Sequence, residues 1–530
     1  MYLTYIRLQN TAYTEVMDVT CKPWALAIKI PIKGEALSLD LLFNSYLIPF
    51  QYFTTFCARW ISIIMDEELS DDSRPRESDK NPSPVLPFTL DLLSSWATTI
   101  RKRITVQKSP ESENIAPVEC TEVLSPMFGS FNIVIPLRYS DGTQWAVRIP
   151  QDVSSDNSDE SAVQAFVSEA LTMRLLKRET TIPVPSIHEY DASFDNALQH
   201  PFMLMDFIDG RLLPQVWFDS SIPKETLETR RLRTLDDLAD AMVQLEKFTF
   251  SQCGSPVFDP QGHVSGIGSV RTLDIAATLA ADSIDPNLTC DLGPFNDPRS
   301  YFLSVLNRRD SPPNNFGRGV YCLLRLFIEW LSTLDGYDSQ RFVLCHPDLD
   351  SQNIFVNQEG NICGIIDWER VAVVPECLGN LSYPAFLARD WDPTAYAYDP
   401  EGTTDVNELD NSPEELMALR SAYQESITRA LLQNKVLSGS SVSESPRWTR
   451  RSLAIRNLKI AADNLLSTHG IVEKVFGKIQ DFLSKQQKSV DMKDRSLYDI
   501  ACDLADGNMN DEVLSLLKEG FLGLCETGLG

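Results

Sequence analysis

The chain has 530 residues, a formal net charge of −27 and 43% hydrophobic residues. This length predicts about three or four units of ordinary domain size, and the hydrophobic content is enough to build packed cores. Binding to nucleic acid needs clustered Lys and Arg, so the acidic balance argues against a nucleic-acid partner. The eleven cysteines form no CxxC pair, which favours free thiols in a reducing compartment and hence a cytoplasmic protein.

Residues 1–86 are expected to form an N-terminal extension. The first residues include Glu15 and Asp18 and lack the basic and apolar pattern of a secretory or transit signal. The stretch 41–58 has no charge and is long enough to span a bilayer, but Pro49 and several polar residues favour a packing or interfacial segment. Residues 66–86 are charged and rich in Ser and Pro, which predicts a disordered acidic linker.

In the next part of the chain, sequence patterns typical of strands alternate with patterns typical of helices. Between residues 118 and 150, two β-rich runs flank Asp141-Gly142, which is a strong hairpin signal. A helix is expected at 161–178, with Glu169 at the border of its apolar stripe. The runs IPVPSIHEYD and PFMLMDFIDG then predict two more strands.

Residues 212–334 have a mostly helical periodicity, and strands are expected again in FVLCHPDLDSQNIFV and GNICGIIDWE. A helix should begin at Ser412-Pro413-Glu414-Glu415, which is a capping box with proline at the first helical position. The Ser-rich stretch 437–446 predicts a flexible spacer, and residues 447–530 a C-terminal helical segment.

These elements predict an α+β, bilobal architecture. A small β-rich N-lobe with one main helix would occupy residues 87–209. A larger helical C-lobe, with acid-bearing strands, would occupy residues 210–436.

Four polar residues interrupt the apolar strands of the large lobe: His346, Asp348, Asn353 and Asp367. Phosphoryl transfer from a nucleotide needs hard oxygen ligands for Mg²⁺ and a carboxylate that accepts the proton of the attacking hydroxyl. An H-x-D sequence with Asn five residues after the Asp, followed by an Asp at a strand end, supplies both the proton-accepting carboxylate and the oxygen ligands. Taken singly, Asp348 and Asn353 are better explained as turn residues and Asp367 as a residue that ends a strand. Taken together, they favour phosphoryl transfer.

HPDLDSQNIFV followed by GIIDWE resembles the aminoglycoside phosphotransferase and choline kinase family, which has a protein-kinase-like fold. More narrowly, the chain is similar to fungal proteins with an aminoglycoside-phosphotransferase-type domain, over about residues 118–435. SPMFGSFNIVIPLRYSDGTQWAVRIP resembles the nucleotide-covering loop and strands of that group, and VSEALTMRLL its helix.

The resemblance implies ATP and Mg²⁺ as cofactors and a role for each matching residue. Asp348 would be the catalytic base, and Asn353 and Asp367 would bind the metal. The remaining nucleotide-site residues would be Gly129, Ser130, Phe131 and Asn132 over the phosphates, the Arg148–Glu169 pair beside them, and the linker from Met205 through Phe207 to Ile208 at the adenine. The family has Lys where WAVRIP has Arg148, and Arg is a larger, planar group, so the sequence leaves open whether phosphate binding is preserved.

Protein kinases are the nearest alternative class, and the residues after Asp367 argue against them. Trp368-Glu369 replaces Phe-Gly, and no A-P-E follows. A small-molecule acceptor is therefore expected. The stretch 391–415 contains no Lys or Arg, which is compatible with an amine-containing acceptor or with a solvated acidic loop.

Two functions follow from these observations. The first is an ATP- and Mg²⁺-dependent kinase that phosphorylates a hydroxyl of a small molecule. The second is a kinase-like binding protein that has lost turnover. Retention of Asp348, Asn353 and Asp367 favours the enzyme, whereas Arg148 and the incomplete glycine loop favour the binding protein.

Overall fold

The structure is a computed structural model of the chain. It describes residues 18–22, 25–32, 35–42, 88–108, 118–129, 132–151, 160–274, 289–337, 341–396, 398, 410–438, 447–486 and 495–528. The linker predicted at 66–86 lies outside these residues, as do most of the uncharged stretch and all but the first two residues of the Ser-rich spacer. Among the helices of the described part, none is long and apolar enough to cross a bilayer.

The first described elements form a three-stranded antiparallel sheet in the order β1-β2-β3. Its strands are β1 (Asp18–Lys22), β2 (Ala25–Ile32) and β3 (Glu35–Leu42).

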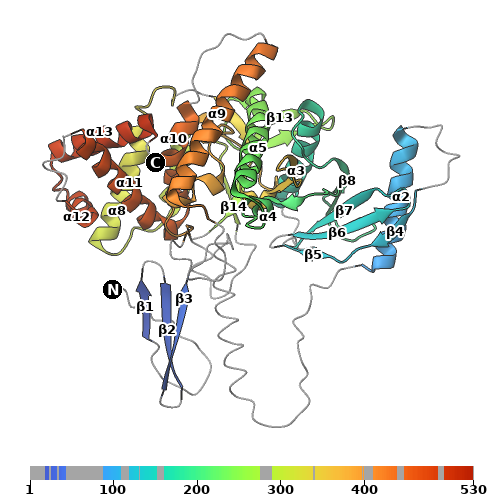
Figure 1. Ribbon diagram of the computed structural model, residues 1–530, viewed down its shortest axis with the longest axis horizontal. Coiled ribbons are helices and arrows are strands. Elements are labelled where there is room, and N and C mark those ends of the chain that lie inside the picture. Colours follow the sequence, from blue (N-terminus) through green and yellow to red (C-terminus); the bar gives the residue numbers. More distant parts are fainter. Residues whose placement is uncertain are drawn as a thin grey trace.

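The small lobe is a six-stranded antiparallel sheet in the order β4-β6-β7-β9-β8, with β5 paired to β6 (Figure 1). Its strands are β4 (Cys120–Val123), β5 (Met127–Phe128), β6 (Asn132–Tyr139), β7 (Gln144–Pro150), β8 (Ile187–Asp191) and β9 (Phe202–Asp206). The hairpin predicted at Asp141-Gly142 joins β6 to β7. Gly142 has a φ of +82°, a left-handed conformation that glycine adopts at no steric cost. The hairpin prediction is confirmed.

Two helices flank this sheet. The predicted helix is α3 (Glu160–Glu179), and its buried residues include Glu169, Ala170 and Met173. A further helix, α2 (Leu90–Lys108), lies at the opposite edge and contributes to a separate core of the small lobe (Figure 1). In that core the rings of Trp96 and Phe202 meet edge to face, with 4.9 Å between centroids.

The large lobe is mainly helical. Its helices are α4 (Leu213–Trp217), α5 (Lys224–Val243), α7 (Pro298–Leu303), α8 (Asn315–Leu331) and α9 (Pro413–Ser438). α9 begins at the predicted capping box, because Ser412 Oγ accepts from the N–H of Glu415 and Glu415 Oε2 accepts from the N–H of Ser412. The bilobal α+β architecture is confirmed.

Two small sheets carry the acid-bearing loops of the large lobe. One has the order β10-β17-β18 and the other β11-β16-β19. The strands are β10 (Arg211–Leu212), β11 (Thr249–Phe250), β16 (Phe342–Cys345), β17 (Ile354–Val356), β18 (Ile362–Ile365) and β19 (Ala372–Pro375).

The C-terminal segment is helical, as predicted, and packs on α8. Its helices are α10 (Arg447–Asp463), α11 (Leu465–Lys485), α12 (Leu497–Asp506) and α13 (Asp511–Thr527). Phe327 of α8 stacks on Phe521 of α13 with 4.9 Å between ring centroids. One hydrophobic core runs from α3 through the large lobe to α13. The division into domains made from the sequence stays a prediction.

The expectation of mostly helical structure over 212–334 is wrong between residues 249 and 292. This region contains two hairpins, built from β12 (Ser255–Phe258), β13 (Val264–Gly268), β14 (Val270–Leu273) and β15 (Thr289–Leu292). The reason is local turn chemistry in Asp259-Pro260-Gln261-Gly262. Asp259 Oδ1 accepts from two backbone N–H groups of the turn, and Gly262 has a φ of +77°.

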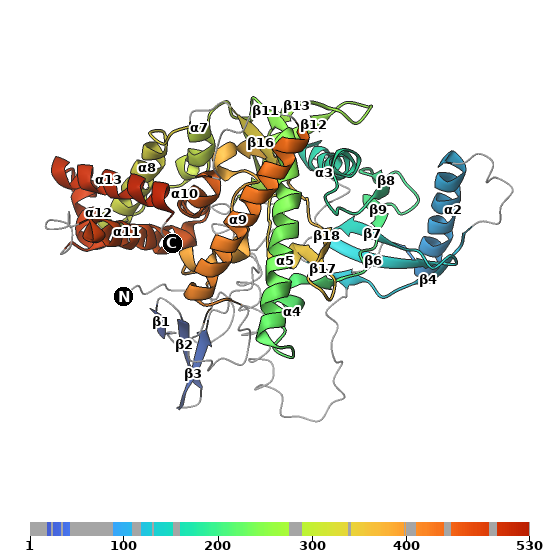
Figure 2. The same cartoon turned by 45° about the horizontal axis from the view of Figure 1, so that its top comes forward.

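The β12–β13 hairpin connects the two lobes. Gly254, just before β12, exchanges two backbone hydrogen bonds with Val373 of β19, at 3.0 and 2.8 Å. On the other side, Ser168 Oγ of α3 donates to the carbonyl of Pro256 at 2.8 Å. Figure 2 shows this hairpin beside α3. The hairpin therefore braces the helix that carries Glu169 against the large lobe.

Candidate active site

The loop that follows β16 is organised by His346, which is buried. The Nδ1 atom of His346 accepts from the backbone N–H of Asp348 at 3.2 Å, so its Nε2 atom carries the proton and donates to the carbonyl of Ile366 at 2.8 Å. Burial lowers the pKa of His346 to about 4, which keeps the ring neutral. The histidine thus connects the Asp348 loop to the residue that precedes Asp367.

Asp348 and Asn353 lie next to each other. The Nδ2 atom of Asn353 donates to the backbone carbonyl of Asp348 at 2.9 Å and lies 3.3 Å from its Oδ2 atom. Burial raises the pKa of the Asp348 carboxyl to about 6, Asp350 adds to this rise, and Arg456 opposes it. A carboxylate with a pKa close to neutrality is suited to accepting a proton during catalysis.

Asp367 follows β18 in a left-handed conformation, with a φ of +64°. The next residue, Trp368, is fully buried and lies against the ring of His346 with 4.6 Å between centroids. The N–H of Ile366 donates to the carbonyl of Asn353 at 2.9 Å. Trp368 anchors the turn, whereas the Asp367 side chain is 44% exposed and therefore accessible to an ion.

Arg148 and Glu169 pair across the small lobe, as predicted, with 2.5 Å between Arg148 Nη1 and Glu169 Oε1. Arg148 Nη2 also lies 3.0 Å from Glu369 and 3.8 Å from Asp367. Burial acts to lower the pKa of the Arg148 guanidinium, but these carboxylates outweigh it and raise the pKa. Burial raises the pKa of Glu169 to about 7, although Arg148 opposes it. One guanidinium therefore faces three acids, an excess of negative charge that a divalent cation can compensate.

Glu369 is a site residue that the sequence reasoning missed. Its Oε2 atom accepts from Arg148 and also from Asn132 Nδ2 at 3.0 Å. It therefore joins the loop of the small lobe to the end of β18. The signal was present in the sequence, because Glu369 is part of the GIIDWE motif, but it was used only to argue against protein kinases.

The loop between β5 and β6 contains the residues expected over the phosphates. The N–H of Gly129 donates to the carbonyl of Asn132 at 2.9 Å, which closes the loop tip. A Cβ atom at Gly129 would lie 3.2 Å from the same carbonyl, so a larger residue would crowd the turn. Ser130 and Phe131 lie outside the described residues.

The linker between the lobes contains Met205 and Phe207, both half-buried. The N–H of Asp206 donates to the carbonyl of Ser186 and the N–H of Phe207 to that of Gln144. Within the described residues the N–H of Ile208 has no backbone partner, and it is the group available to an adenine. A cavity of about 560 Å³ is lined by residues 206–209 and the loop 183–185, but not by Arg148, Asp348 or Asp367.

The side-chain oxygens of Asn353 and Asp367 fit a magnesium ion that is shared with a nucleotide. In the described part of the chain no three His, Cys, Asp or Glu residues are grouped so that they could hold a metal by themselves. Mg²⁺ in nucleotide sites is held by one or two carboxylates together with substrate phosphates, so such a cluster is not required. Asp367 and Asn353 supply the oxygens that this arrangement needs.

Asp350 supports the loop rather than the reaction. It is fully buried and accepts two hydrogen bonds from Arg389 Nη2, at 3.0 and 2.9 Å. Arg389 Nη1 also pairs with Asp410 at 3.0 Å. A buried, paired carboxylate of this kind holds backbone in place, which explains the third polar residue of the HPDLD sequence.

Comparison with known proteins assigns this arrangement to a family. Residues 137–375 match the model of the phosphotransferase enzyme family. This part of the chain is therefore similar to that family. It contains Arg148, Glu169 and the whole loop from His346 to Glu369.

Two fungal proteins are among the curated relatives of the chain. The chain is 28% identical over 185 residues to altered inheritance of mitochondria protein 9 of Meyerozyma guilliermondii, which covers 32% of this chain and 28% of that protein. It is 26% identical over 272 residues to the clavilactone A biosynthesis cluster protein Y of Ampulloclitocybe clavipes, covering 49% and 62%. The chain thus spans less than two thirds of the length of either relative.

Among solved structures, the chain is similar to a putative fructosamine-3-kinase from Thermobifida fusca. The identity is 15%, the TM-score is 0.38, and the match covers 67% of this chain and 93% of that one.

The ion pair between Arg148 and Glu169 gives a stability prediction. Arg148→Met leaves Glu169 buried without its partner, so we expect a loss of about 3–5 kcal/mol in the free energy of unfolding. Without Arg148, burial holds the pKa of the Glu169 carboxyl above its value in the unfolded chain. Ionising this carboxyl therefore destabilises the folded state at pH values above the unfolded pKa, so the loss should be larger at pH 8 than at pH 5. Chemical denaturation at both pH values measures it.

Two matched variants control this measurement. Arg148→Lys keeps a cation and should lose much less, and the double variant Arg148→Met/Glu169→Gln should recover part of the loss. Equal stabilities of Arg148→Met and the unmodified chain would mean that the pair contributes nothing to folding.

Proposed function

We propose that the chain is an ATP- and Mg²⁺-dependent phosphotransferase that moves the γ-phosphate of ATP to a hydroxyl of a small molecule. The observation that carries this proposal is the grouping of Asp348, Asn353 and Asp367, with the pKa of Asp348 raised to about 6. A structural turn needs neither a carboxyl of this pKa nor a second exposed carboxylate on the neighbouring strand.

In the proposed reaction Asp348 accepts the proton of the acceptor hydroxyl as its oxygen attacks the γ-phosphorus. The bond from the γ-phosphorus to the bridging oxygen breaks, and ADP leaves with the electron pair. Asn353 and Asp367 would hold Mg²⁺, which when bound neutralises charge on the phosphates. Arg148, oriented by Glu169, would contact the phosphates, and the N–H of Ile208 would contact the adenine.

A binding protein without turnover is the second candidate. Glu369 accepts hydrogen bonds from both Arg148 and Asn132, the two side chains expected to bind phosphates. If Glu369 kept both groups when ATP is present, Arg148 and Asn132 would not hold the γ-phosphate for transfer, and a bound nucleotide would not be turned over.

The proposed location is the cytoplasm, with a small-molecule acceptor, no nucleic-acid partner and no membrane span. An amine on the acceptor stays a prediction from the acidic stretch 391–415, much of which lies outside the described residues. Cell fractionation tests the location, and recovery in the mitochondrial fraction would contradict it.

Calorimetric titration of ATP with and without Mg²⁺ separates the two candidates. A kinase should bind ATP more tightly with Mg²⁺ and consume ATP when an acceptor is supplied. Metal-independent ATP binding without consumption, across panels of amino alcohols, sugars and hydroxy acids, would favour the binding protein.

A further inference from the structure

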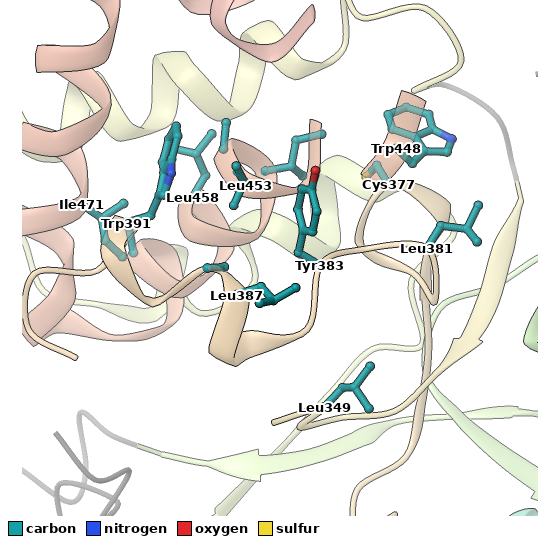
Figure 3. Close-up of a cluster of buried hydrophobic side chains, with 14 of the residues drawn as sticks. Leu349, Cys377, Leu381, Tyr383, Leu387, Trp391, Trp448, Leu453, Leu458 and Ile471 are labelled. Atoms are coloured by element: carbon teal, nitrogen blue, oxygen red, sulfur yellow. The ribbon is translucent and has the colours of Figure 1, made fainter. Parts of the chain in front are cut away.

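Helix α10, from the C-terminal segment, contacts the polypeptide next to the catalytic loop. Ser452 Oγ accepts from the N–H of Tyr383 at 3.1 Å, and Arg456 Nη1 donates to the carbonyl of the same residue at 3.3 Å. Ser452 and Arg456 are four residues apart and so lie on one face of the helix. In Figure 3, Tyr383 lies beside Leu453 of α10.

The segment that follows Tyr383 is in turn hydrogen-bonded to the catalytic loop. The N–H of Ala385 donates at 2.8 Å to the carbonyl of Leu349, the residue after the proposed base. Two hydrogen bonds, one at Tyr383 and one at Ala385, therefore connect the guanidinium of Arg456 to the catalytic loop through the backbone of residues 383–385.

Arg456 differs from the other arginines on this side of the large lobe. Arg389 pairs with Asp350 and Asp410, and Arg420 pairs with Asp390 at 2.7 Å. Within the described part of the chain, Arg456 is half-buried and has no ion pair. A guanidinium that makes no ion pair is available to bind an anion through charge-assisted hydrogen bonds.

The position of Arg456 assigns that anion to the acceptor rather than to ATP. Arg148 lies 3.8 Å from Asp367, on the side of the small lobe and the phosphate loop. Arg456 instead comes from α10, on the far side of the catalytic loop, and contacts Tyr383 in the segment after the GIIDWE motif. Arg148 is therefore placed to bind the phosphates of ATP, and Arg456 is placed to bind the acceptor.

We propose that Arg456 binds an anionic group of the acceptor, so that the acceptor is a hydroxyl compound carrying a carboxylate or a phosphate. This inference rests on the proposed function. The hydroxyl gives its proton to Asp348 and its oxygen to the γ-phosphorus, and the anion stays paired with Arg456. An acceptor that carries an amine and no anionic group, as the acidic stretch 391–415 led us to expect, is the alternative outcome of the test.

The test uses the full chain saturated with the non-hydrolysable analogue AMP-PNP and Mg²⁺, so that the nucleotide site is filled. Glycerate, glycerol 3-phosphate, glycerol and ethanolamine are then titrated in by calorimetry. At least one of the two anionic probes should bind more tightly than glycerol and ethanolamine. Which of the two binds distinguishes a carboxylate from a phosphate.

Three variants make the test specific. Arg456→Gln keeps a donor for the Tyr383 carbonyl but loses the charge, and should weaken binding of the anionic probe about ten- to a hundredfold. Arg456→Lys should recover part of it. Arg429→Gln is the control, since it removes one charge from an exposed arginine paired with Asp236.

The outcomes separate the inference from the proposed function. Anionic probes that bind no better than glycerol, or that bind Arg456→Gln as tightly as the unmodified chain, overturn the inference. Tighter binding of ethanolamine also overturns it. Failure of AMP-PNP and Mg²⁺ to bind at all overturns the proposed function, and the inference with it.

Discussion

Replacing Asp348 by Asn is expected to lower turnover by about two to four orders of magnitude and to leave the affinity for ATP and Mg²⁺ nearly unchanged. The amide keeps the size of the side chain and its contact with Asn353, but it cannot accept the proton of the acceptor hydroxyl. ATP consumption with a saturating acceptor measures the loss, and calorimetric titration of ATP measures binding.

The pH profile provides a second measurement of the same role. Asp348 must be deprotonated to act as a base, so activity should be present above a pH of about 6 and be lost as the pH falls through its pKa. The residual activity of Asp348→Asn should lack this decline. Asp236→Asn, at an exposed carboxylate on α5, is the control for the loss of one charge. Unchanged turnover in Asp348→Asn would show that Asp348 is a turn residue.

Replacing Asp367 should weaken nucleotide binding itself. Loss of groups that merely support metal ligands costs about ten- to a hundredfold in affinity, so loss of a ligand should cost at least that much. We therefore expect the affinity for ATP in the presence of Mg²⁺ to fall about a hundredfold or more. The affinity without Mg²⁺ should change little, and calorimetric titrations under both conditions measure the difference.

The choice of substitution matters because Asp367 has a φ of +64°. Asn tolerates this conformation better than Ala does, so Asp367→Asn removes the charge with the least backbone strain. Comparison with Asp367→Ala isolates the effect of the backbone, and thermal unfolding should show that both variants fold. If the dependence of ATP binding on Mg²⁺ survives in both, Asp367 is not a metal ligand.

Local patterns in the sequence were sufficient for the elements whose determinants lie close together. The hairpin at Asp141-Gly142 and the helix beginning at Ser412 depend on two to four neighbouring residues, and both are found. The spacing of Asp348, Asn353 and Asp367 also predicted that they would meet, because short strands bring the two loops together. The roles of these residues stay predictions.

Partners that are distant in the chain could not be predicted in this way. Glu369 meets Asn132 across 237 positions, and Arg389 meets Asp350 through a loop whose path has no local signal. The hairpins between 249 and 292 were missed for a different reason. They are short, and the helical periodicity of the flanking segments dominated the interpretation of the whole region.

The β12–β13 hairpin has a consequence for control of the protein. In protein kinases the helix that carries the glutamate moves, and its position switches activity on and off. Here Ser168, the neighbour of Glu169, donates a hydrogen bond to the β12–β13 hairpin. The hairpin is in turn joined to β19 by two backbone hydrogen bonds at Gly254. A glycine is required at residue 254, since a Cβ atom there would lie 2.0 Å from the carbonyl oxygen of Gly268. We therefore expect α3 to be set in place when the chain folds, rather than to be moved by an activating modification.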